Sequence, residues 1–511
     1  MDNIQSFEEK ELKISYTSII VGILLLAVLL TLLIRSGFPK GFIFLGFVML
    51  GMIITFTKIE YGILSLFIYI TFISYFRRLF YTSTASVKDF DILVVLPEFI
   101  IVFLVMKMFF DIITMNKEPF WVEEGKRNFD VADLWITIFL IYQMMEIFNS
   151  SLLSPISGIL GFRAFGIYMF LYYIARQYID TKKKMDILIN IIIISCFFAG
   201  LYGIKQMLFG FNSGEKILIE SGQFQSLTIA YTIRRVFSTL NSPIHAGIIF
   251  ILGSVFSLNR FQKSETLKEK VIYSLIIITL MFANIGTIQR TNWVGMIAVF
   301  VFYFVLQPGI FKKLNIKLFA SLGILIILSL FIVSKVSIKK GPVEYRPYDI
   351  FIEKFETIKE PEKVGSFQLR LKVWSNLKKI LFTKPFGYGL YSSKFEEEES
   401  FGTDNIYFTF ILQNGAVGLF LYLFGVIFIL LRVVKIFREV KDEYFIENIV
   451  IFASIIISVL IMGITANLIS VQPLIFFIFI WLGIIVNYKK ITTEVEETPS
   501  LNPGVYFSRY R

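Results

Sequence analysis

The chain has 511 residues, of which 56% are hydrophobic and only 17% are charged. Its mean hydropathy is +0.71, whereas about a quarter of the residues of a soluble domain are charged. So few charges cannot cover a water-facing surface, which excludes a soluble globular enzyme and a disordered chain. The apolar runs are long and continuous, and this favours membrane-spanning helices over an outer-membrane barrel, whose strands alternate.

The net charge is +11, from 50 Lys and Arg against 39 Asp and Glu. Cytoplasmic loops of membrane proteins collect Lys and Arg, so we favour that origin over nucleic-acid binding, with an anionic substrate as a second use of the excess. The single Cys and single His rule out an intramolecular disulfide and leave almost no ligands for zinc, haem or iron–sulfur sites. We therefore expect no metal, no other cofactor and no nucleic-acid partner.

About fourteen apolar segments are long enough to be membrane spans. They cover residues 14–34, 41–57, 61–76, 91–110, 131–148, 158–175, 186–209, 243–258, 271–289, 292–307, 318–336, 406–431, 446–465 and 473–487. One of them carries Arg163, and the long run 406–431 contains Gly415 and Gly418, so it is either a tilted span or a broken pair. We expect an all-α, polytopic membrane protein with about 12–14 transmembrane helices. The acidic, polar N-terminus is unlike a cleaved signal peptide, so the first span should be retained.

The basic residues of the short loops predict that both termini are cytoplasmic. The loops that then fall inside contain Arg176, Lys182, Lys183, Lys184, Arg260, Lys263, Lys268, Lys270, Lys312, Lys313, Lys317, Arg432, Lys435, Arg438 and Lys441. Loops 149–157 and 466–472 on the other side have no Lys or Arg, although Arg77 and Arg78 fall outside against the trend. The predicted organisation is transmembrane helices 1–11 over residues 1–336, an extracytoplasmic loop domain over 337–405, helices 12–14 over 406–487 and a cytoplasmic tail over 488–511.

The segment 337–405 is the longest stretch of soluble-like composition. A loop of this size without a function is uncommon, so we expect it to form part of the working face. Its apolar residues recur at helical spacing and predict an amphipathic helix at the membrane surface, which ends at Pro385, Gly387 and Gly389. These apolar positions are Leu369, Val373, Leu377, Ile380 and Leu381. The acidic run from Glu396 to Glu399 reads as a solvated face, because four adjacent acids lack the spacing of a cation cage.

Ionisable residues beside spans are costly and mark candidate functional sites. Four sets lie on the expected outer side: Arg234 with Arg235, Arg290, Arg370 with Trp374, and Asp404 with Asn405. Arginine binds phosphate through a planar fork, and a carboxylate can accept a hydroxyl proton. The set suits transfer of a group from a lipid phosphate or diphosphate to an alcohol, with Asp404 orienting or deprotonating the hydroxyl. The alternatives are that the arginines reach lipid headgroups and that Asp404 caps a helix.

Three weaker candidates are Lys205, Arg163 and His245. Lys205 lies at the outer end of a span, where it can contact a sugar or extend to the interface. Arg163 is a candidate for the same cavity. His245, the only histidine, reads first as a polar residue at a helix start and second as an acceptor contact. Glu98 and Glu146, within or at the end of spans, are each a candidate to pair with an arginine, with no further role implied.

Four segments in order resemble the O-antigen ligase and O-antigen polymerase superfamily of polysaccharide-assembling membrane proteins. They are RRVFSTLNSPIHAGIIFIL, TIQRTNWVGMIAVF, RLKVWSNLKKILFTKPFGYGL and TDNIYFTFILQNGAVGLFLYLFGVIF. The first resembles the family's segment with Arg, Asn and Pro that enters a span, and the second resembles its polar segment with Arg before an aromatic-rich helix. The third resembles its Arg-x-x-x-Trp helix, which continues into Pro-x-Gly-x-Gly. The fourth resembles the block in which His-Asn or Asp-Asn precedes an apolar helix. The resemblance extends over residues 160–487.

The resemblance implies a helical fold of the lipid-sugar glycosyltransferase (GT-C-like) type, an extracytoplasmic site and a glycan donor on undecaprenyl diphosphate. Family ligases carry His before the Asn of the last block, whereas this chain has Asp404, which favours a polymerase. The expected activity is transfer of a growing glycan to the non-reducing end of another lipid-linked repeat unit, at the outer face of the bacterial plasma (inner) membrane, for O-antigen, capsule or exopolysaccharide. Attack opposite the diphosphate predicts inversion of configuration.

The expected site follows from these motifs. Asp404, Arg290 and Arg370 are the expected catalytic residues, and the substrate-binding set is Arg234, Arg235, Asn405, His245, Lys205, Arg163 and Trp374. Undecaprenyl-diphosphate-linked oligosaccharides are the expected donor and acceptor, with membrane lipids, chain-length regulators and flippase proteins as further candidate partners. Two alternatives stay open: a ligase acting on a lipid or protein acceptor, and a lipid-linked oligosaccharide flippase. A transporter favours related halves and charges near the bilayer midplane, and neither is evident in the sequence.

Overall fold

A computed structural model describes most of the apolar part of the chain. The described residues are 40–79, 93–114, 118–123, 126–152, 154–220, 228–229, 233–307, 338–340, 343–345, 381–390 and 405–493. The expected spans 14–34 and 318–336 therefore lie outside them, as does most of the long loop.

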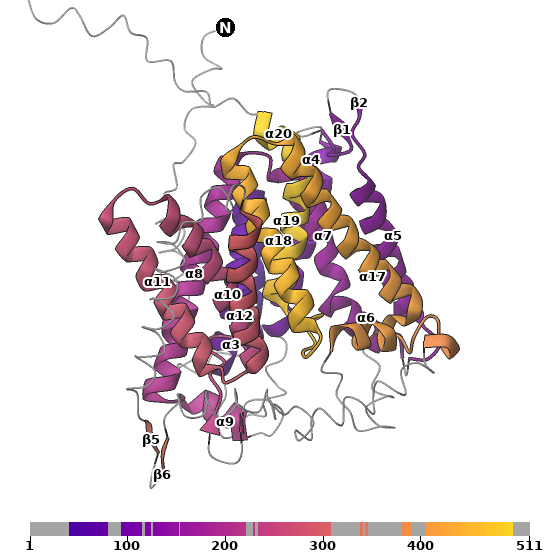
Figure 1. Cartoon of the computed structure of the whole chain (residues 1–511). Coiled ribbons are helices and arrows are strands. Elements are labelled where there is room, and N and C mark those ends of the chain that lie inside the picture. The colour runs from indigo at the N-terminus through magenta and orange to yellow at the C-terminus, as the bar shows by residue number, and fades with distance from the viewer. Residues whose placement is uncertain are drawn as a thin grey trace, which may run out of the picture.

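The described chain is a bundle of α-helices (Figure 1). The helices are α2 (Lys40–Thr57), α3 (Ile59–Leu79), α4 (Leu96–Ile113), α5 (Val131–Met145), α6 (Pro155–Ala164), α7 (Phe170–Tyr178), α8 (Lys182–Phe209), α9 (Ser213–Glu220), α10 (Pro243–Lys263), α11 (Leu267–Gly286), α12 (Arg290–Leu306), α17 (Ile406–Glu439), α18 (Glu443–Gly463), α19 (Gln472–Val486) and α20 (Tyr488–Thr493), with short 3-10 turns η2 (Glu146–Phe148) and η3 (Gly166–Met169).

Three two-stranded antiparallel ribbons add to the helices. They pair β1 (Val122–Glu123) with β2 (Lys126–Arg127), β3 (Thr228–Ile229) with β4 (Ile233–Arg234), and β5 (Ile338–Lys340) with β6 (Val343–Tyr345). They are too short to change the all-α class.

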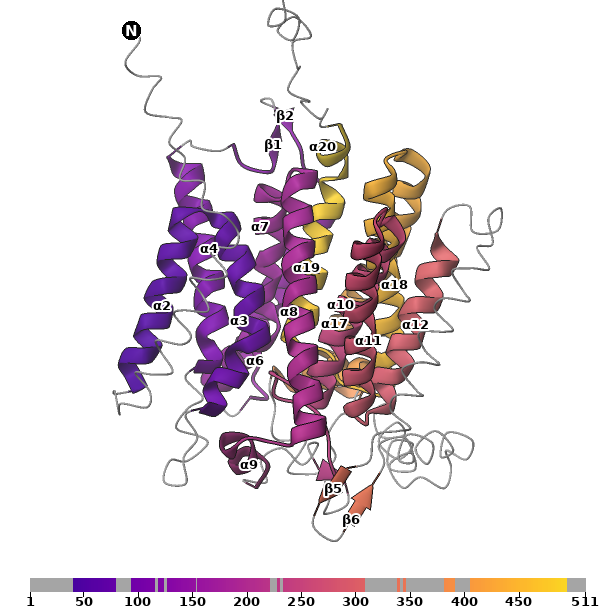
Figure 2. The same cartoon turned by 90° about the vertical axis from the view of Figure 1, so that its left-hand side faces the viewer.

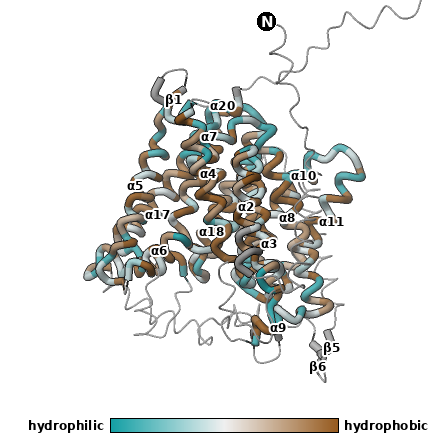
Figure 3. Tube along the Cα trace, turned by 180° about the vertical axis from the view of Figure 1, so that it is seen from behind, coloured by the Kyte–Doolittle hydropathy of each residue, from teal (hydrophilic) through white to brown (hydrophobic). Residues whose placement is uncertain are grey.

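Eight of the described helices are long and apolar enough to cross a membrane, or nine if the bent pair α6 and α7 is one span. Shorter apolar helices correspond to the expected spans at 41–57, 292–307 and 473–487. Hydrophobic residues occupy the middle of the helices and hydrophilic residues gather toward both ends (Figure 3). The prediction of a polytopic helical membrane protein is confirmed.

The spans run alternately up and down between two ends. We call the lower end in Figure 1, where α8 and α11 finish and α10 and α12 begin, the motif end. The other end, where α8 and α11 begin, is the opposite end. Helices α2, α3 and α4 form one group, α10, α11, α12 and α18 form another, and α7, α8 and α19 lie between them (Figure 2).

Helix α19 is the centre of the core. It packs against α7, α10 and α3, and Trp481 is fully buried. At Gly483 an added Cβ would lie 2.6 Å from the carbonyl oxygen of Tyr172, so glycine allows α19 and α7 to approach closely. A helix that is apolar on every side suits this central place.

Helix α17 is broken in its first third. Gly415 has φ 62° and ψ −164°, a conformation that only glycine adopts without strain. The sequence left a tilted span and a broken pair open, and the structure has the broken form.

Candidate functional site

The segment before α10 is held against the bundle by a buried glutamine. Gln206, on α8, accepts hydrogen bonds through its side-chain oxygen from the backbone N–H groups of Phe237 (3.2 Å) and Ser238 (2.7 Å). Its amide nitrogen donates to the Ser238 carbonyl at 3.1 Å and to Glu215 at 2.7 Å. Ser238 has φ 55°, so the backbone makes a sharp turn here. The route of the chain into α10 is thus fixed by side chains.

Arg78 completes this anchor from α3. Its side chain is fully buried and donates to the carbonyls of Leu240 and Ser238, the latter at 2.6 Å. The guanidinium also lies 3.6 Å from Glu215 and 4.8 Å from the ring of Phe237. The sequence marked Arg78 only as an exception to the loop-charge rule. The exception has a physical reason, since this arginine binds a neighbouring loop inside the bundle.

Arg234 and Arg235 come directly before the anchored segment. Arg234 ends β4, and its guanidinium lies 4.0 Å from the carboxylate of Glu220, a side chain that is 67% exposed. Arg235 is half-buried. Both predicted arginines therefore lie at the motif end.

Arg290 is the first residue of α12 and is half-buried. The start of α12 is tied to the start of α10, because the buried Asn292 donates to the Pro243 carbonyl at 2.8 Å and to Thr287 Oγ1 at 3.1 Å. A Cβ at Gly247 would overlap the Asn292 side chain, so this contact needs a glycine. The structure brings Arg290 to the same end as Arg234 and Arg235.

His245 and Lys205 also lie at the motif end. His245 occupies the first turn of α10, and its N–H bonds to the capping hydroxyl of Ser242 at 3.4 Å. This matches the interpretation of a polar residue at a helix start. Lys205, near the end of α8, donates to the Gly210 carbonyl at 3.0 Å and lies 5.4 Å from the centre of the Tyr202 ring.

Asn405 links the start of α17 to the end of α18. Its side-chain oxygen accepts from the N–H groups of Tyr407 (2.8 Å) and Phe408 (3.1 Å), so it is the N-cap of α17. Its amide nitrogen donates to the Ile464 carbonyl at the end of α18, at 2.7 Å. Asn405 is therefore the residue that caps α17. Asp404 itself lies outside the described residues, as do Arg370 and Trp374.

The Pro-x-Gly-x-Gly motif forms a turn that docks on the break in α17. We call residues 385–389 the docked turn. Tyr388 and Gly389 donate their N–H groups to the carbonyls of Leu412 (2.7 Å) and Gln413 (3.1 Å), and Val417 donates to Pro385 at 3.3 Å. The break exposes backbone groups that a continuous helix would have satisfied internally, and the docked turn satisfies them.

The docked turn needs glycine on both sides of the contact. Gly387 and Gly389 have φ values of 69° and 86°. A Cβ at Gly415 would overlap the Pro385 carbonyl. The Asn149 side chain holds the turn from the loop after α5, donating to the Phe386 carbonyl at 3.1 Å and to Glu146 at 2.7 Å. The end of the long loop is thus fixed to the bundle at the motif end.

Arg163 lies in a buried polar cluster that the sequence revealed only in part. It sits on α6, which meets the η3–α7 segment at a 44° bend, and its charge acts on both Glu98 and Tyr168. Gln472, at the start of α19, approaches Glu98 at 3.5 Å. The sequence offers Glu98 as a candidate to pair with an arginine, but it does not indicate that Tyr168 and Gln472 lie in the same cluster.

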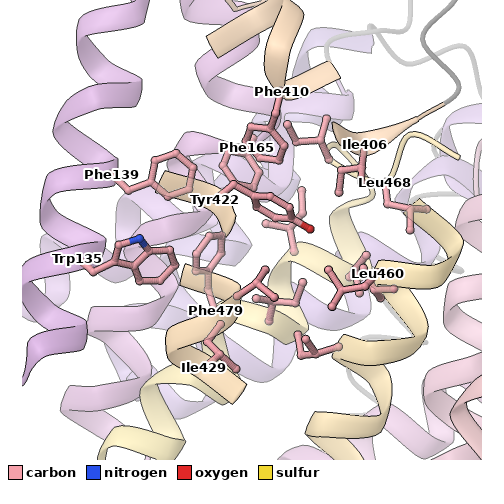
Figure 4. A pocket seen from close by; sticks show the side chains of 17 residues that line it. Trp135, Phe139, Phe165, Ile406, Phe410, Tyr422, Ile429, Leu460, Leu468 and Phe479 are labelled. Carbon is pink, nitrogen blue, oxygen red and sulfur yellow. The ribbon is translucent and has the colours of Figure 1, made fainter. Parts of the chain in front are cut away.

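An apolar pocket lies among the helices of the bundle (Figure 4). Its cavity volume is about 70 Å³. Its walls come from α5, α17, α18 and α19, and they include Trp135, Phe410, Tyr422 and Phe479. Ile406, the neighbour of Asn405 in the chain, is also part of the lining. Such a lining suits a hydrocarbon chain.

Comparison with known protein families gives a match. A family model described as O-antigen ligase matches residues 275–423, which include the start of α12, the docked turn and the break in α17. No curated protein matches the chain. Within the described ranges, no three His, Cys, Asp or Glu side chains gather as a metal ion would require. The match over residues 275–423 supports the resemblance to the O-antigen ligase and polymerase superfamily.

Proposed function

We propose that this protein is a membrane glycosyltransferase that polymerises lipid-linked glycan repeats in the assembly of a surface polysaccharide. The observation that carries the proposal is the position of Arg234, Arg235 and Arg290 at the end of the bundle where α17 begins with Ile406, a residue that lines an apolar pocket. A lipid-diphosphate-linked sugar needs both features together, since its head is anionic and its tail is hydrocarbon.

The arginines bind the diphosphate in this proposal. Guanidinium groups bind phosphate oxygens bidentately and keep their charge when partly desolvated. Arg290 stands at the N-terminus of α12, where the helix dipole adds a partial positive charge. The pocket beside Ile406 and Phe410 takes the part of the isoprenoid chain nearest the diphosphate.

Asp404 receives the proton. The acceptor hydroxyl oxygen forms a bond to the anomeric carbon of the donor sugar, while the bond from that carbon to the diphosphate oxygen breaks. The proton of the hydroxyl passes to the Asp404 carboxylate, and the lipid diphosphate leaves with its negative charge held by the arginines. Attack from the face opposite the leaving group inverts the anomeric configuration. Asn405 supports this role by fixing the chain next to Asp404.

The experiment is a polymer assay on purified lipid-linked repeats. We expect Asp404→Asn to lose at least about a hundredfold in rate. We expect Arg290→Ala and Arg370→Ala each to lose roughly 30- to 1,000-fold, because a charge-assisted phosphate contact contributes about 2–4 kcal/mol to the transition state. Arg290→Lys should rescue poorly, since Lys cannot bind bidentately.

Arg438→Ala is the matched control, because Arg438 is an exposed arginine at the opposite end. It should polymerise at the normal rate. Normal polymer from the Asp404 and Arg290 variants would remove the proposed chemistry.

A ligase is the second candidate, since the matching family model is described as O-antigen ligase. The two activities differ in their acceptor. Lipid-linked repeats alone suffice for a polymerase, whereas a ligase yields product only when a separate lipid or protein acceptor is added. Product that depends on the separate acceptor would replace the polymerase proposal with the ligase.

The proposal requires the motif end to face the outside of a bacterial plasma membrane. Ser366→Cys, in the long loop, should react in intact cells with a membrane-impermeant thiol reagent. The only native cysteine, Cys196, is buried, so background labelling should be low. Labelling that appears only after lysis would reverse the orientation.

A further inference from the structure

A second cavity lies at the opposite end of the bundle, far along α8 from the proposed site. It opens between the first turns of α3 and α8 and holds about 800 Å³ of empty space, including its mouth. We call it the basic pocket. Its lining is Lys58, Glu60, Tyr61, Ile63, Leu64, Ile179, Thr181, Lys183, Lys184, Ile187 and Leu188. Charged residues come from the helix starts, and apolar residues come from the next turn of each helix.

The three lysines of the basic pocket are not equivalent. Lys184 is committed within the protein, because its ammonium lies 3.0 Å from Glu60 and 2.8 Å from Asp180. Lys58 and Lys183 are exposed, and neither forms an ion pair with any residue that the structure describes. Glu60 is thus already matched, and the rim of the pocket keeps two positive charges.

The walls below this rim are apolar and largely buried. Ile63 and Leu188 are 2% and 1% exposed, and Leu64 is also buried. Both α3 and α8 are long enough to span the membrane. The rim therefore lies where spans meet the headgroup layer, and the walls lie at the depth of the acyl chains. Two helix N-termini, at Ile59 and Lys182, add partial positive charge at the rim.

We propose that the basic pocket binds one anionic phospholipid. Lys58 and Lys183 contact its phosphate group, and an acyl chain lies along Ile63, Leu64, Ile187 and Leu188. Basic pockets between transmembrane helices are suited to anionic headgroups. A free phosphate ion would make no use of the apolar walls, and lysines that only extend to the interface would need no cavity. This site is separate from the glycan site and does not depend on the proposed function.

The test measures lipid binding to the full-length protein in detergent, by native mass spectrometry during titration with phosphatidylglycerol or with phosphatidylcholine. We expect one phosphatidylglycerol to bind in preference to phosphatidylcholine. Lys58→Gln with Lys183→Gln should weaken phosphatidylglycerol binding about 30-fold, since each lysine near a membrane surface contributes about 1 kcal/mol, or about fivefold. Both residues are exposed, so the double variant should fold normally.

Lys268→Gln with Lys270→Gln is the matched control. These two lysines are exposed on the first turn of α11, at the same end, and the change in net charge is identical. The control should retain the preference for phosphatidylglycerol. An equal loss in both double variants would show diffuse attraction to the whole surface and overturn the proposal.

A third variant tests the cavity without changing charge. Ile187 lines the pocket and is half-buried, so Ile187→Trp should fill the space. We expect it to abolish the bound phosphatidylglycerol while all lysines remain. Undiminished binding by Ile187→Trp, or equal binding of the two lipids to the unaltered protein, would also overturn the proposal.

Discussion

The two ends of the bundle hold their basic residues in different ways. At the opposite end, carboxylates match the cations in the pairs Lys182–Asp442 (2.6 Å), Lys263–Glu447 (2.6 Å), Arg432–Asp130 (2.7 Å), Arg176–Asp133 and Arg260–Asp186. At the motif end, Arg78 binds two carbonyls and also lies 3.6 Å from Glu215, whereas Lys205 donates to a carbonyl and Arg234 has a carboxylate only at 4.0 Å. A carbonyl holds a cation in place without cancelling its charge, so Lys205 keeps its positive charge at the motif end.

The largest expected effect tests how the motif end is built. Gly415→Val puts a β-branched residue at positive φ and forces the docked turn away. Losing three backbone hydrogen bonds and adding backbone strain should cost about 4–6 kcal/mol of folding free energy. Thermal unfolding in detergent, followed by tryptophan fluorescence, measures the change.

Gly46→Ala is the control for this prediction. Gly46 lies within α2, and nothing lies within 4 Å of an added Cβ there. Alanine is favoured over glycine in a helix interior, so stability should be unchanged or slightly higher. Equal stability of Gly415→Val and Gly46→Ala would mean that the docked turn does not hold the motif end.

The next effect removes a buried ion pair from the opposite end. Arg176 and Asp133 are 4% and 1% exposed, and Arg176→Ala leaves the carboxylate buried with only Tyr172 and a backbone N–H as partners. Breaking such a pair costs about 3–5 kcal/mol. Polymer formed per folded molecule should stay normal, because the pair lies away from the motif end. A lower rate of polymer formation per folded molecule would contradict the prediction that this ion pair affects stability and not activity.

A smaller effect is expected from Gln206→Leu, which removes the anchor of the segment before α10. Leaving buried N–H groups unsatisfied costs about 1–3 kcal/mol. Because Gln206 acts through the position of Arg234 and Arg235, KM should rise about tenfold or more while kcat changes less. Steady-state kinetics on lipid-linked repeats separates the two.

Gln262→Leu is its counterpart at the opposite end. Gln262 accepts from Tyr303 at 2.9 Å and from Gln307 at 3.0 Å. This variant should lose stability without a change in KM. A rise in KM in both glutamine variants would indicate a general loss of packing rather than a positioning role for Gln206.

The smallest effect belongs to the exposed pairs of the opposite end. Arg260→Gln removes the partner of Asp186, whose side chain is 39% exposed. Exposed ion pairs contribute about 0–1 kcal/mol, so the unfolding temperature should move little, and the small change should shrink in high salt. A large loss of stability would show that the ion pairs at this end act as one network.

The sequence predicted the spans well because a membrane imposes a length of apolar chain, as in α10 and α18. It left α17 undecided because glycine permits a positive φ without requiring one. The break at Gly415 depends on the docked turn, whose residues 385–389 lie well before it in the chain. The spacing of apolar residues within α17 does not indicate a contact with residues 385–389.

The candidate site was predicted in part. The motifs identified Arg234, Arg235 and Arg290, which lie together at one end. They did not reveal that Gln206 holds the segment before α10 or that Arg78 faces inward, because charge and hydropathy do not say which polar side chain meets a distant carbonyl. Asn405 is expected to bind substrate, and its contacts also fix two helix ends. The contact of Asn405 with the end of α18 forms only when the fold brings α17 and α18 together, so the sequence alone does not predict it.

The basic residues in the ion pairs of the opposite end act differently during membrane insertion and after folding. During membrane insertion, Lys182, Arg260 and Arg432 act as positive charges that set topology, because acidic residues contribute little to it. Their carboxylate partners Asp442, Asp186 and Asp130 reach them only after the helices assemble. In the proposed orientation, the same residues first retain the loops in the cytoplasm and later become neutral contacts between helices. A charge reversal within one pair could therefore preserve the folded contact and still misdirect the nascent chain.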